Sequence, residues 1–350
     1  MTSYATTGRG SNSLRRPPAN ARERLVAAYR RTGADLPYGD PLPAHGSPME
    51  GWFWRLTDAS SGRVVVALCS VNEHPDGDWA TVAVGMHPGG VLQVGAFDVV
   101  TAQRDIFALN ARTTSGDAVA ASVDALRIDL DDVHLDLRFA DSFQWPKAFA
   151  GAGLVSSIPF LSQYWHPHRL GGTATGTVEF DGGRWSFDAA TLYAEKNWGP
   201  GFPERWWWGQ AHDFGTADVS VVFTGGLLQL GPIRTDAAVV VVRLGDQVIR
   251  VAPPARVQCQ TGDGRWRVHA KSLRYQIDLE GDAPGREPHM LPVPILAERR
   301  NIGAAVEHLA GRLRCTVRER GRVVFDGTSE LAGLEVGSLP AHSRTGGSGK

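Results

Sequence analysis

The alternation of apolar and polar residues along the chain predicts short strands joined by tight turns. Residues 49–56 and 63–68 both read as strands, and Ser60-Ser61-Gly62 reads as the turn between them. Asp-Gly and Gly-Asp pairs recur near residues 76, 181, 245 and 262. These pairs supply the positive backbone angles that tight hairpins require. We therefore expect an all-β, mostly antiparallel fold in barrels or sandwiches.

Helical patterns are few and short. Residues 21–31 could form one helix, stopped by Gly33 and Pro37, and Ile302 to Leu313 is the next candidate. Longer amphipathic runs are scarce. We expect a fold in which few short helices accompany many strands.

The pattern is interrupted between residues 143 and 172 by Gln144-Trp145-Pro146, Gly151-Ala152-Gly153 and Ile158-Pro159. We divide the chain there into two β units. The division gives a partly disordered N-terminal arm at 1–44 and a barrel-like unit at 45–165. A second unit follows at 166–338, and a flexible tail at 339–350 ends the chain.

Charge and cysteine content narrow the class of protein. The chain of 350 residues has 36 basic and 37 acidic residues and a net charge of −1, so no global field attracts nucleic acid or an anionic membrane. Cys69, Cys259 and Cys315 fit no disulfide framework. The N-terminus lacks the apolar core of a secretory signal, and no apolar run is long enough to span a membrane. We expect a soluble, cytoplasmic protein, with room for transient contact with a membrane surface.

The densest candidate chemistry lies between Tyr193 and Gln210. Residues 185–192 read as a strand, so Trp185, Tyr193 and Glu195 should share one side if no bulge intervenes. A carboxyl group against aromatic walls loses hydration and becomes a better proton donor near neutral pH. The alternative is a structural Glu195 that pairs with Lys196 or Arg205.

Several motifs resemble the tocopherol cyclase family. They are Glu50-Gly51-Trp52-Phe53, Tyr193-Ala194-Glu195-Lys196-Asn197-Trp198-Gly199, Gly201-Phe202-Pro203, Trp206-Trp207-Trp208, Phe325-Asp326-Gly327-Thr328-Ser329 and Gly333-Leu334-Glu335-Val336-Gly337. The resemblance runs from about Glu50 to Gly337, and the Glu-Lys-Asn-Trp-Gly block followed by Gly-Phe-Pro is its most distinctive part. The family is similar to carotenoid hydratases and to proteins built from two lipocalin-like β units. The resemblance therefore favours two lipocalin-like barrels or half-barrels over sandwiches.

The family resemblance implies an isomerase (an intramolecular lyase) that closes a chromanol ring without redox chemistry. A protonated alkene of a prenylated hydroquinone gives a tertiary cation, and a phenol oxygen captures it. Glu195 is then the proton donor, Lys196 and Asn197 of the same block are further catalytic candidates, and Glu50 is a second acid candidate. The expected substrate-binding residues are Tyr193, Trp185, Trp198, Trp206, Trp208, Gln210, His212 and Trp52.

Two other functions stay open at this point. A hydratase would trap the cation with water, and a lipocalin-like carrier would bind a hydrophobic small molecule without reacting with it. No cofactor and no obligate protein partner are expected. His166-Pro167-His168 resembles a metal-binding pair, but Pro167 interrupts the strand and no third ligand has a fixed spacing, so we expect no metal site.

Overall fold

The computed structural model describes residues 20–36, 40–42, 45–102, 107–112, 118–216, 218–230, 232–283, 285 and 287–340. Of the predicted N-terminal arm, residues 1–19, 37–39 and 43–44 lie outside the described residues. The C-terminal tail from residue 341 does so too. No helix in the described ranges is long and apolar enough to cross a membrane.

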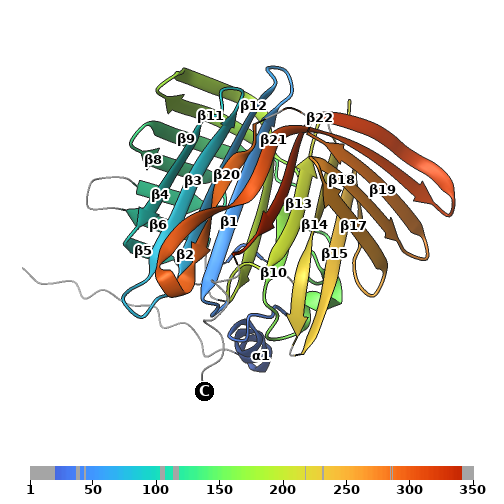
Figure 1. Cartoon of the computed structure of the whole chain (residues 1–350), viewed down its shortest axis with the longest axis horizontal. Helices are drawn as coiled ribbons and strands as arrows, with labels where there is room; N and C mark the ends of the chain where they lie inside the picture. The colour runs from blue at the N-terminus through green and yellow to red at the C-terminus, as the bar shows by residue number, and fades with distance from the viewer. Residues whose placement is uncertain are drawn as a thin grey trace, which may run out of the picture.

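The elements are almost all strands, as the sequence pattern predicts (Figure 1). The helices are α1 (Ala21–Arg30) and the short 3-10 turns η1 (Gly153–Ser157) and η2 (Leu296–Glu298). The strands of the first sheet are β1 (Met49–Asp58), β2 (Arg63–Asn72), β3 (Trp79–His87), β4 (Leu92–Phe97), β5 (Val99–Ala102), β6 (Ala108–Arg112), β7 (Ala118–Ser122), β8 (Ala125–Leu130), β9 (Val133–Ala140), β10 (Tyr164–Arg169), β11 (Thr173–Phe180) and β12 (Gly183–Gly199). The strands of the second sheet are β13 (Arg205–Ala211), β14 (Val219–Leu230), β15 (Ile233–Leu244), β16 (Gln247–Val251), β17 (Arg256–Gly262), β18 (Arg265–Lys271), β19 (Tyr275–Asp282), β20 (His289–Ile295), β21 (Arg300–Glu319) and β22 (Arg322–Ser338).

The first sheet runs in the order β4-β3-β2-β1-β12-β11-β9-β8-β7-β6-β5, and β10 pairs with β12. It curls into a nearly closed barrel, because β4 also contacts β8 and β3 contacts β5. The second sheet runs β16-β15-β14-β13-β22-β21-β19-β18-β17, and β20 pairs with β21. Neighbouring strands are antiparallel throughout both sheets. The predicted all-β antiparallel class is confirmed.

Two expectations about chain organisation need correction. Residues 302–313 form no helix but lie within β21, which pairs with β19, β20 and β22. Pairing on both edges outweighs the helical propensity of its alanines and glutamates. The interrupted stretch near residue 165 does not separate the sheets either, since β10, β11 and β12 stay with the first sheet and the chain crosses over at residues 200–204.

The two sheets pack against each other through β2, β3 and β4 on one side and β20 and β21 on the other (Figure 1). Alternate side chains of β1 point to the barrel core and to the second sheet. Trp52, Trp54 and Leu56 lie in the barrel core, whereas Phe53 packs against Trp208 of the second sheet. The completely buried Arg55 also faces the second sheet. The gap between the sheets therefore has both apolar and polar walls.

Arg55 ties the sheets together by hydrogen bonds. Its guanidinium donates to the carbonyls of Leu309 at 2.7 Å and Leu331 at 2.6 Å, both in the second sheet. It also donates to Gln210 Oε1 at 3.3 Å. A buried charge is tolerated only when such acceptors compensate for its lost hydration. These bonds fix how the two walls of the gap sit against each other.

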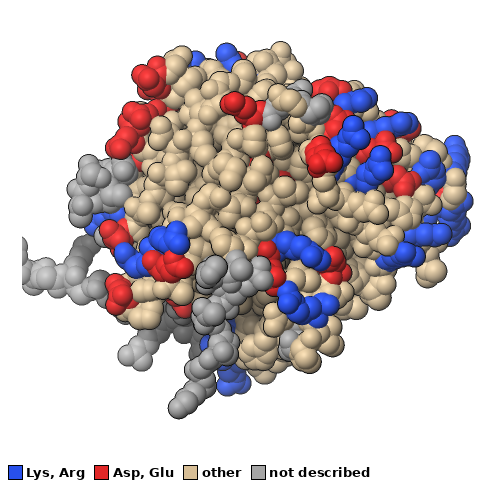
Figure 2. Space-filling model, in the orientation of Figure 1, with Lys and Arg blue, Asp and Glu red and all other residues tan. Residues whose placement is uncertain are grey.

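The charged surface has no dominant sign. On the face seen in Figure 2, acidic and basic side chains are intermixed, and they are densest at the outer end of the second sheet. This distribution fits the net charge of −1. An electrostatic footprint for nucleic acid would need a basic stripe.

Candidate functional site

A β-bulge on β12 sets which side chains face the gap between the sheets. Ala190 pairs with Ala174, but Phe187 pairs with Gly176, so Asp188 and Ala189 of β12 lie opposite one residue of β11. An extra residue in one strand reverses the faces of all residues beyond it. The expectation that Trp185 shares the side of Glu195 is therefore wrong.

The side chains before and after the bulge therefore alternate between the two faces of the sheet in opposite order. Trp185 and Phe187 lie in the barrel core together with Leu192 and Ala194. Tyr193 belongs instead to the apolar cluster that includes Trp165 and Trp208, between the sheets. The bulge thus delivers the Tyr193 and Glu195 side chains to the gap and keeps Trp185 away from it.

Three donors converge on one oxygen of Glu195. The indole N–H groups of Trp165 and Trp208 donate to Oε2 at 2.8 Å and 2.9 Å. The Tyr193 hydroxyl donates to the same atom. Glu195 Oε1 has no hydrogen-bond partner among the described residues. The two oxygens of this carboxyl group therefore have different surroundings.

Burial dominates the acidity of this carboxyl group. Glu195 is 5% exposed. Desolvation raises the pKa of Glu195 above its ordinary value, and the three hydrogen bonds from Tyr193, Trp165 and Trp208 offset part of that rise. Burial also raises the pKa of Tyr193, with the charge of Glu195 adding to the effect, so its hydroxyl keeps its proton. The site holds an acid in dry surroundings, with donors that favour its ionised form.

A cavity of about 170 Å³ opens beside Glu195 between the two sheets. A cavity of roughly 150 Å³ is large enough for benzene, so an aromatic ring fits here. Its walls combine aromatic side chains with aliphatic ones and a few polar groups. The lining includes Phe53, Trp165, Glu195, Asn197, Trp206, Trp208 and Glu335.

The cavity gathers five of the residues predicted from the sequence. Glu195, Asn197, Trp52, Trp206 and Trp208 all line it. Trp206 and Trp208 alternate with Trp207, which instead packs in the core of the second sheet. The side-chain amide of Asn197 has no hydrogen-bond partner among the described residues, and Gly51 leaves room for it, since a Cβ there would lie 2.7 Å from Asn197 Oδ1.

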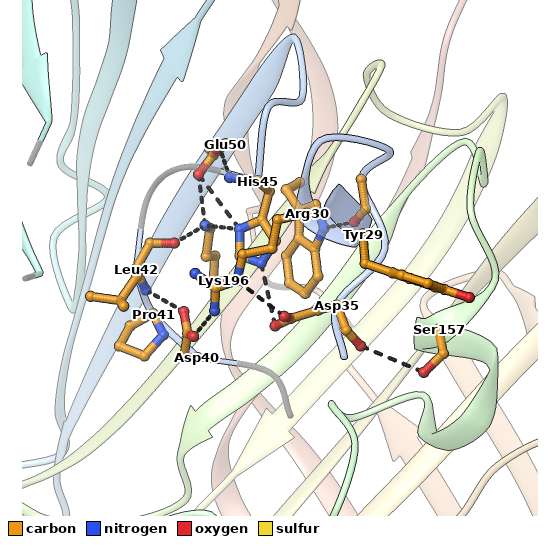
Figure 3. A network of polar contacts seen from close by, with 12 residues as sticks. Tyr29, Arg30, Asp35, Asp40, Pro41, Leu42, His45, Glu50, Ser157 and Lys196 are labelled. Atoms are coloured by element: carbon orange, nitrogen blue, oxygen red, sulfur yellow. Dashed lines mark hydrogen bonds and ion pairs between the residues drawn. The ribbon is translucent and has the colours of Figure 1, made fainter. Parts of the chain in front are cut away.

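Lys196 points away from the cavity and binds the N-terminal arm (Figure 3). Its ammonium group donates to Glu50 Oε2 at 2.7 Å and to the carbonyl of Leu42, and it lies 2.7 Å from His45 Nδ1. Asp35 and Arg30 extend this network to the end of α1. Lys196 is a structural anchor for the arm in this arrangement and does not pair with Glu195. Arg205 pairs with Asp236 at the surface, so the alternative of a salt-bridged Glu195 is wrong.

Glu50 is a poor second acid. Burial alone would raise its pKa, but the charge of Lys196 and the contact with His45 outweigh burial and lower the pKa of Glu50 to about 2. The carboxyl group is therefore ionised near neutral pH. It is the ion-pair partner of Lys196 and has no proton to donate there.

Besides Trp185 and Tyr193, three more predicted binding residues lie outside the cavity wall. Trp198 lies on the same face of β12 as Lys196, and its ring stacks on His45 with the ring centroids 4.3 Å apart. Gln210 is buried against Arg55. His212 is buried with Nδ1 3.3 Å from the carbonyl of Val219, and burial lowers its pKa to about 3. None of the three is among the residues that line the cavity, and Tyr193 contributes through its hydrogen bond to Glu195.

Sequence reasoning missed two cavity residues. Trp165 directly precedes His166 in the interrupted stretch, and a tryptophan beside polar residues in an irregular segment is a signal that could have identified it. Glu335 was noted only as part of the closing Gly-Leu-Glu-Val-Gly motif. Trp206 donates its indole N–H to Oε1 of Glu335. Gly333, Glu335 and Gly337 alternate along the chain, so on a strand they share one face. Two glycines beside a single glutamate on one face are a signal that the glutamate faces a crowded space.

One cluster in the described part of the chain has ligand spacing for a metal ion. It consists of Asp35, Asp40 and His45. Arg30 already bonds both aspartates, so a guanidinium supplies the positive charge at that place. The three residues lie beside Lys196 in the polar network at the N-terminal arm (Figure 3).

The fold and the site define a class: an all-β protein of two packed sheets, with a buried carboxylic acid in the cavity between them. The model of the tocopherol cyclase-like family matches residues 129–338, which is more than half of the 350 residues. The chain belongs to the tocopherol cyclase-like family.

Two plant proteins illustrate the relationship. The chain is 30% identical over 201 residues to the "Probable tocopherol cyclase, chloroplastic" of Oryza sativa subsp. japonica, which covers 54% of this chain and 42% of that protein. It is 29% identical over 206 residues to the "Tocopherol cyclase, chloroplastic" of Zea mays, covering 55% of this chain and 43% of that protein. The match therefore spans less than half of either relative.

Solved structures share the fold at low identity. The crystal structure of CghA with Sch210972 superimposes with a TM-score of 0.60 over 87% of this chain and 94% of that chain, at 13% identity. A second crystal structure of CghA gives a TM-score of 0.55 over 83% and 88% of the two chains, at 12% identity. At such identities the likeness establishes the arrangement of the sheets and nothing more.

Proposed function

We propose that this protein is a tocopherol cyclase-like enzyme that closes a chromanol-type ring on a prenylated hydroquinone. The observation that carries the proposal is the Glu195 carboxyl group, which faces an aromatic-walled cavity while three donors hold its other oxygen. Family membership supports the same reaction class.

The hydrogen bonds decide where the reactive proton resides. An indole N–H can only donate, so Trp165 and Trp208 occupy lone pairs of Oε2. The proton of the neutral acid therefore belongs on Oε1. From there it transfers to one carbon of the substrate alkene, and the other alkene carbon becomes a tertiary cation.

The same donors promote this transfer. Hydrogen bonds to an ionised acceptor are roughly twice as strong as neutral ones, so the bonds from Trp165, Trp208 and Tyr193 strengthen as the carboxylate forms. They stabilise the transition state more than the ground state, as an oxyanion hole does. Burial meanwhile keeps a protonated fraction available, since it raises the pKa of Glu195.

The cation forms among aromatic walls. Trp165, Trp206 and Trp208 line the cavity, and Phe53 lies edge-on to Trp208 with ring centroids 5.3 Å apart. An aromatic face stabilises a nearby cation by about 0.5–2 kcal/mol, more when water is excluded. The phenol oxygen then bonds to the cationic carbon, which closes the ring, and the phenol proton leaves. The free amide of Asn197 is suited to orient that phenol before capture.

The Glu195 carboxyl group in the cavity also helps to decide between the cyclase and its two alternatives, the carrier and the hydratase. A passive carrier would gain nothing from burying a carboxyl group among apolar walls, because burial of a charge is unfavourable. A hydratase would use the same acid and cation, with water in place of the phenol. The cyclase is favoured over the hydratase by family membership, and the products separate the two experimentally.

Product mass is the decisive test. Purified protein is incubated with a panel of prenylated hydroquinones and acyclic polyenes, and products are analysed by mass spectrometry and by the loss of the free phenol. A cyclised product keeps the mass of its substrate, whereas a hydrated one gains one water. Cyclisation of at least one prenylated hydroquinone supports the proposal; hydration alone, or binding without turnover across the panel, would refute it.

A further inference from the structure

The motif Gly333-Leu334-Glu335-Val336-Gly337 contributes Glu335 to the cavity wall, and the reaction above gives Glu335 no role. It lies on β22, which pairs with β13. The Cα partners are Gly333 with Gln210, Glu335 with Trp208, and Gly337 with Trp206. Partners across an antiparallel pair point to the same face, so Glu335 and both cavity tryptophans share one side.

The two glycines make room for the tryptophan rings. A Cβ at Gly337 would lie 2.0 Å from Cζ2 of Trp206, and one at Gly333 would lie 3.0 Å from Cζ3 of Trp208. Each ring therefore occupies the space above a glycine, on either side of Glu335. The motif has the composition needed to hold one carboxyl group between two indoles.

The Glu335 carboxyl group opens into the same cavity as Glu195. Both residues line it, and Trp206 anchors Glu335 through its indole N–H. Trp208, the cross-strand partner of Glu335, reaches across the gap to bond Glu195. One tryptophan thus separates two carboxyl groups that face one cavity from opposite sheets.

The environment sets the acidity of this second carboxyl group. Burial, with a smaller contribution from the charge of Glu195, raises the pKa of Glu335 to about 7 against the opposing hydrogen bond from Trp206. The ionised form of Glu195 disfavours ionisation of Glu335, so the two carboxyl groups titrate as a coupled pair.

Two other buried charged or titratable groups face this region. Glu307 on β21 is the Cα partner of Glu335, and Arg55 on β1 lies close to it. Burial raises the pKa of Glu307, the charge of Glu335 adds to the rise, and Arg55 opposes it. Neither Glu307 nor Arg55 is among the residues that line the cavity, so Glu335 is the carboxyl group within reach of a ligand beside Glu195.

We propose that Glu335 is the general base that accepts the phenol proton as the chromanol-type ring closes, an inference that rests on the proposed cyclase function. The proton balance is complete within the cavity. Glu195 gives its proton to the alkene carbon, the phenol oxygen forms its bond to the cation, and the phenol proton passes to Glu335. The reactive form has Glu195 protonated and Glu335 ionised, and return of the proton from Glu335 to Glu195 restores that form.

The test compares pH–rate profiles of the wild-type enzyme and three variants with a prenylated hydroquinone that the wild type cyclises. Glu335→Gln removes the base but keeps the size of the side chain. Glu335→Asp keeps a carboxyl group. Glu330→Gln is the control, since Glu330 is an exposed residue of the same strand that pairs with Arg312 at the surface.

The wild type should show a bell-shaped dependence of kcat on pH, because the fully protonated pair lacks a base and the fully ionised pair lacks an acid. Glu335→Gln should lower kcat by roughly 10²-fold with little change in KM, and the fall in rate toward acid pH should disappear. Glu335→Asp should retain that acid limb, and Glu330→Gln should match the wild type.

Each contrary outcome has its own meaning. A Glu335→Gln variant with an intact acid limb and wild-type kcat would overturn the role of Glu335 and leave the cyclase proposal standing. An equal loss of kcat in both Glu335 variants, with the pH profile unchanged, would reduce Glu335 to a structural residue. A wild-type protein that cyclises no substrate would remove the proposed function, and the assignment of Glu335 with it.

Discussion

The indole N–H of Trp208 donates to Oε2 of Glu195 at 2.9 Å, and this bond crosses from the second sheet to the first. The two residues are only thirteen positions apart, yet the chain changes sheets between them. The acid and one of its stabilising donors therefore belong to opposite walls of the cavity. Any shift between the sheets would change the strength of the acid.

Removing that donor should slow the reaction. Trp208→Phe keeps an aromatic wall but deletes one hydrogen bond to the carboxylate that forms as the proton leaves. A bond to a charged group contributes about 1.5–3 kcal/mol, so kcat should fall roughly 10- to 100-fold. The measurement is kcat at several pH values with one cyclisable substrate.

Trp207→Phe is the matched control for this change. Trp207 packs in the core of the second sheet, and its indole nitrogen has no hydrogen-bond partner among the described residues. The control should keep wild-type turnover. Equal losses in both variants would show that Trp208 matters for packing alone.

The Glu50–Lys196 pair should make the fold sensitive to acid. The pKa of Glu50 falls from its ordinary value of 4.5 to about 2 in the folded protein. Between these values the unfolded chain binds more protons than the folded one, so stability is present above about pH 4.5 and is lost toward about pH 2. The loss should amount to up to about 3 kcal/mol.

Chemical unfolding between pH 7 and pH 2.5 measures this effect. Glu50→Gln should be less stable than the wild type at pH 7, because Lys196 loses its partner, and the difference should shrink toward pH 2.5. Glu280→Gln is the control, because Glu280 is exposed. A difference between wild type and Glu50→Gln that is constant over this pH range would contradict the ion pair.

Gly337 should tolerate no larger side chain. Alanine normally stabilises a strand relative to glycine. At Gly337, however, its Cβ would meet the ring of Trp206 at 2.0 Å. Overpacking of this kind destabilises by about 1–3 kcal/mol, so Gly337→Ala should lower the melting temperature. Gly262→Ala is the control, because a Cβ at Gly262 meets no atom within 4 Å, and it should leave the melting temperature unchanged. A Gly337→Ala variant as stable as this control would show that Trp206 lies elsewhere.

Much of this architecture could be predicted from the sequence. Strand-and-turn alternation gives the all-β class, and the aromatic and charged residues around Glu195 mark the site, because both features are local. The helix predicted at residues 21–31 is observed as α1 at Ala21–Arg30, and the structure adds a capping box of Asn20 and Glu23 at its start.

The rest depends on contacts that local patterns do not contain. The bulge at Asp188 and Ala189 needs the register between β11 and β12, and without it Trp185 is placed on the wrong face. Lys196 is adjacent to Glu195 in sequence, yet it bonds Glu50, which lies 146 positions away. Glu335 reaches the cavity only because β22 pairs with β13.

The most direct test of the account is the turnover of Glu195→Gln, measured together with its melting temperature on the same preparation. Glutamine keeps the size of the side chain and can still accept hydrogen bonds from Trp165, Trp208 and Tyr193, but it has no acidic proton. We predict that kcat falls by roughly 10²–10⁴-fold while substrate binding and melting temperature stay close to the wild type. A variant that folds and cyclises its substrate at the wild-type rate would contradict Glu195 as the proton donor.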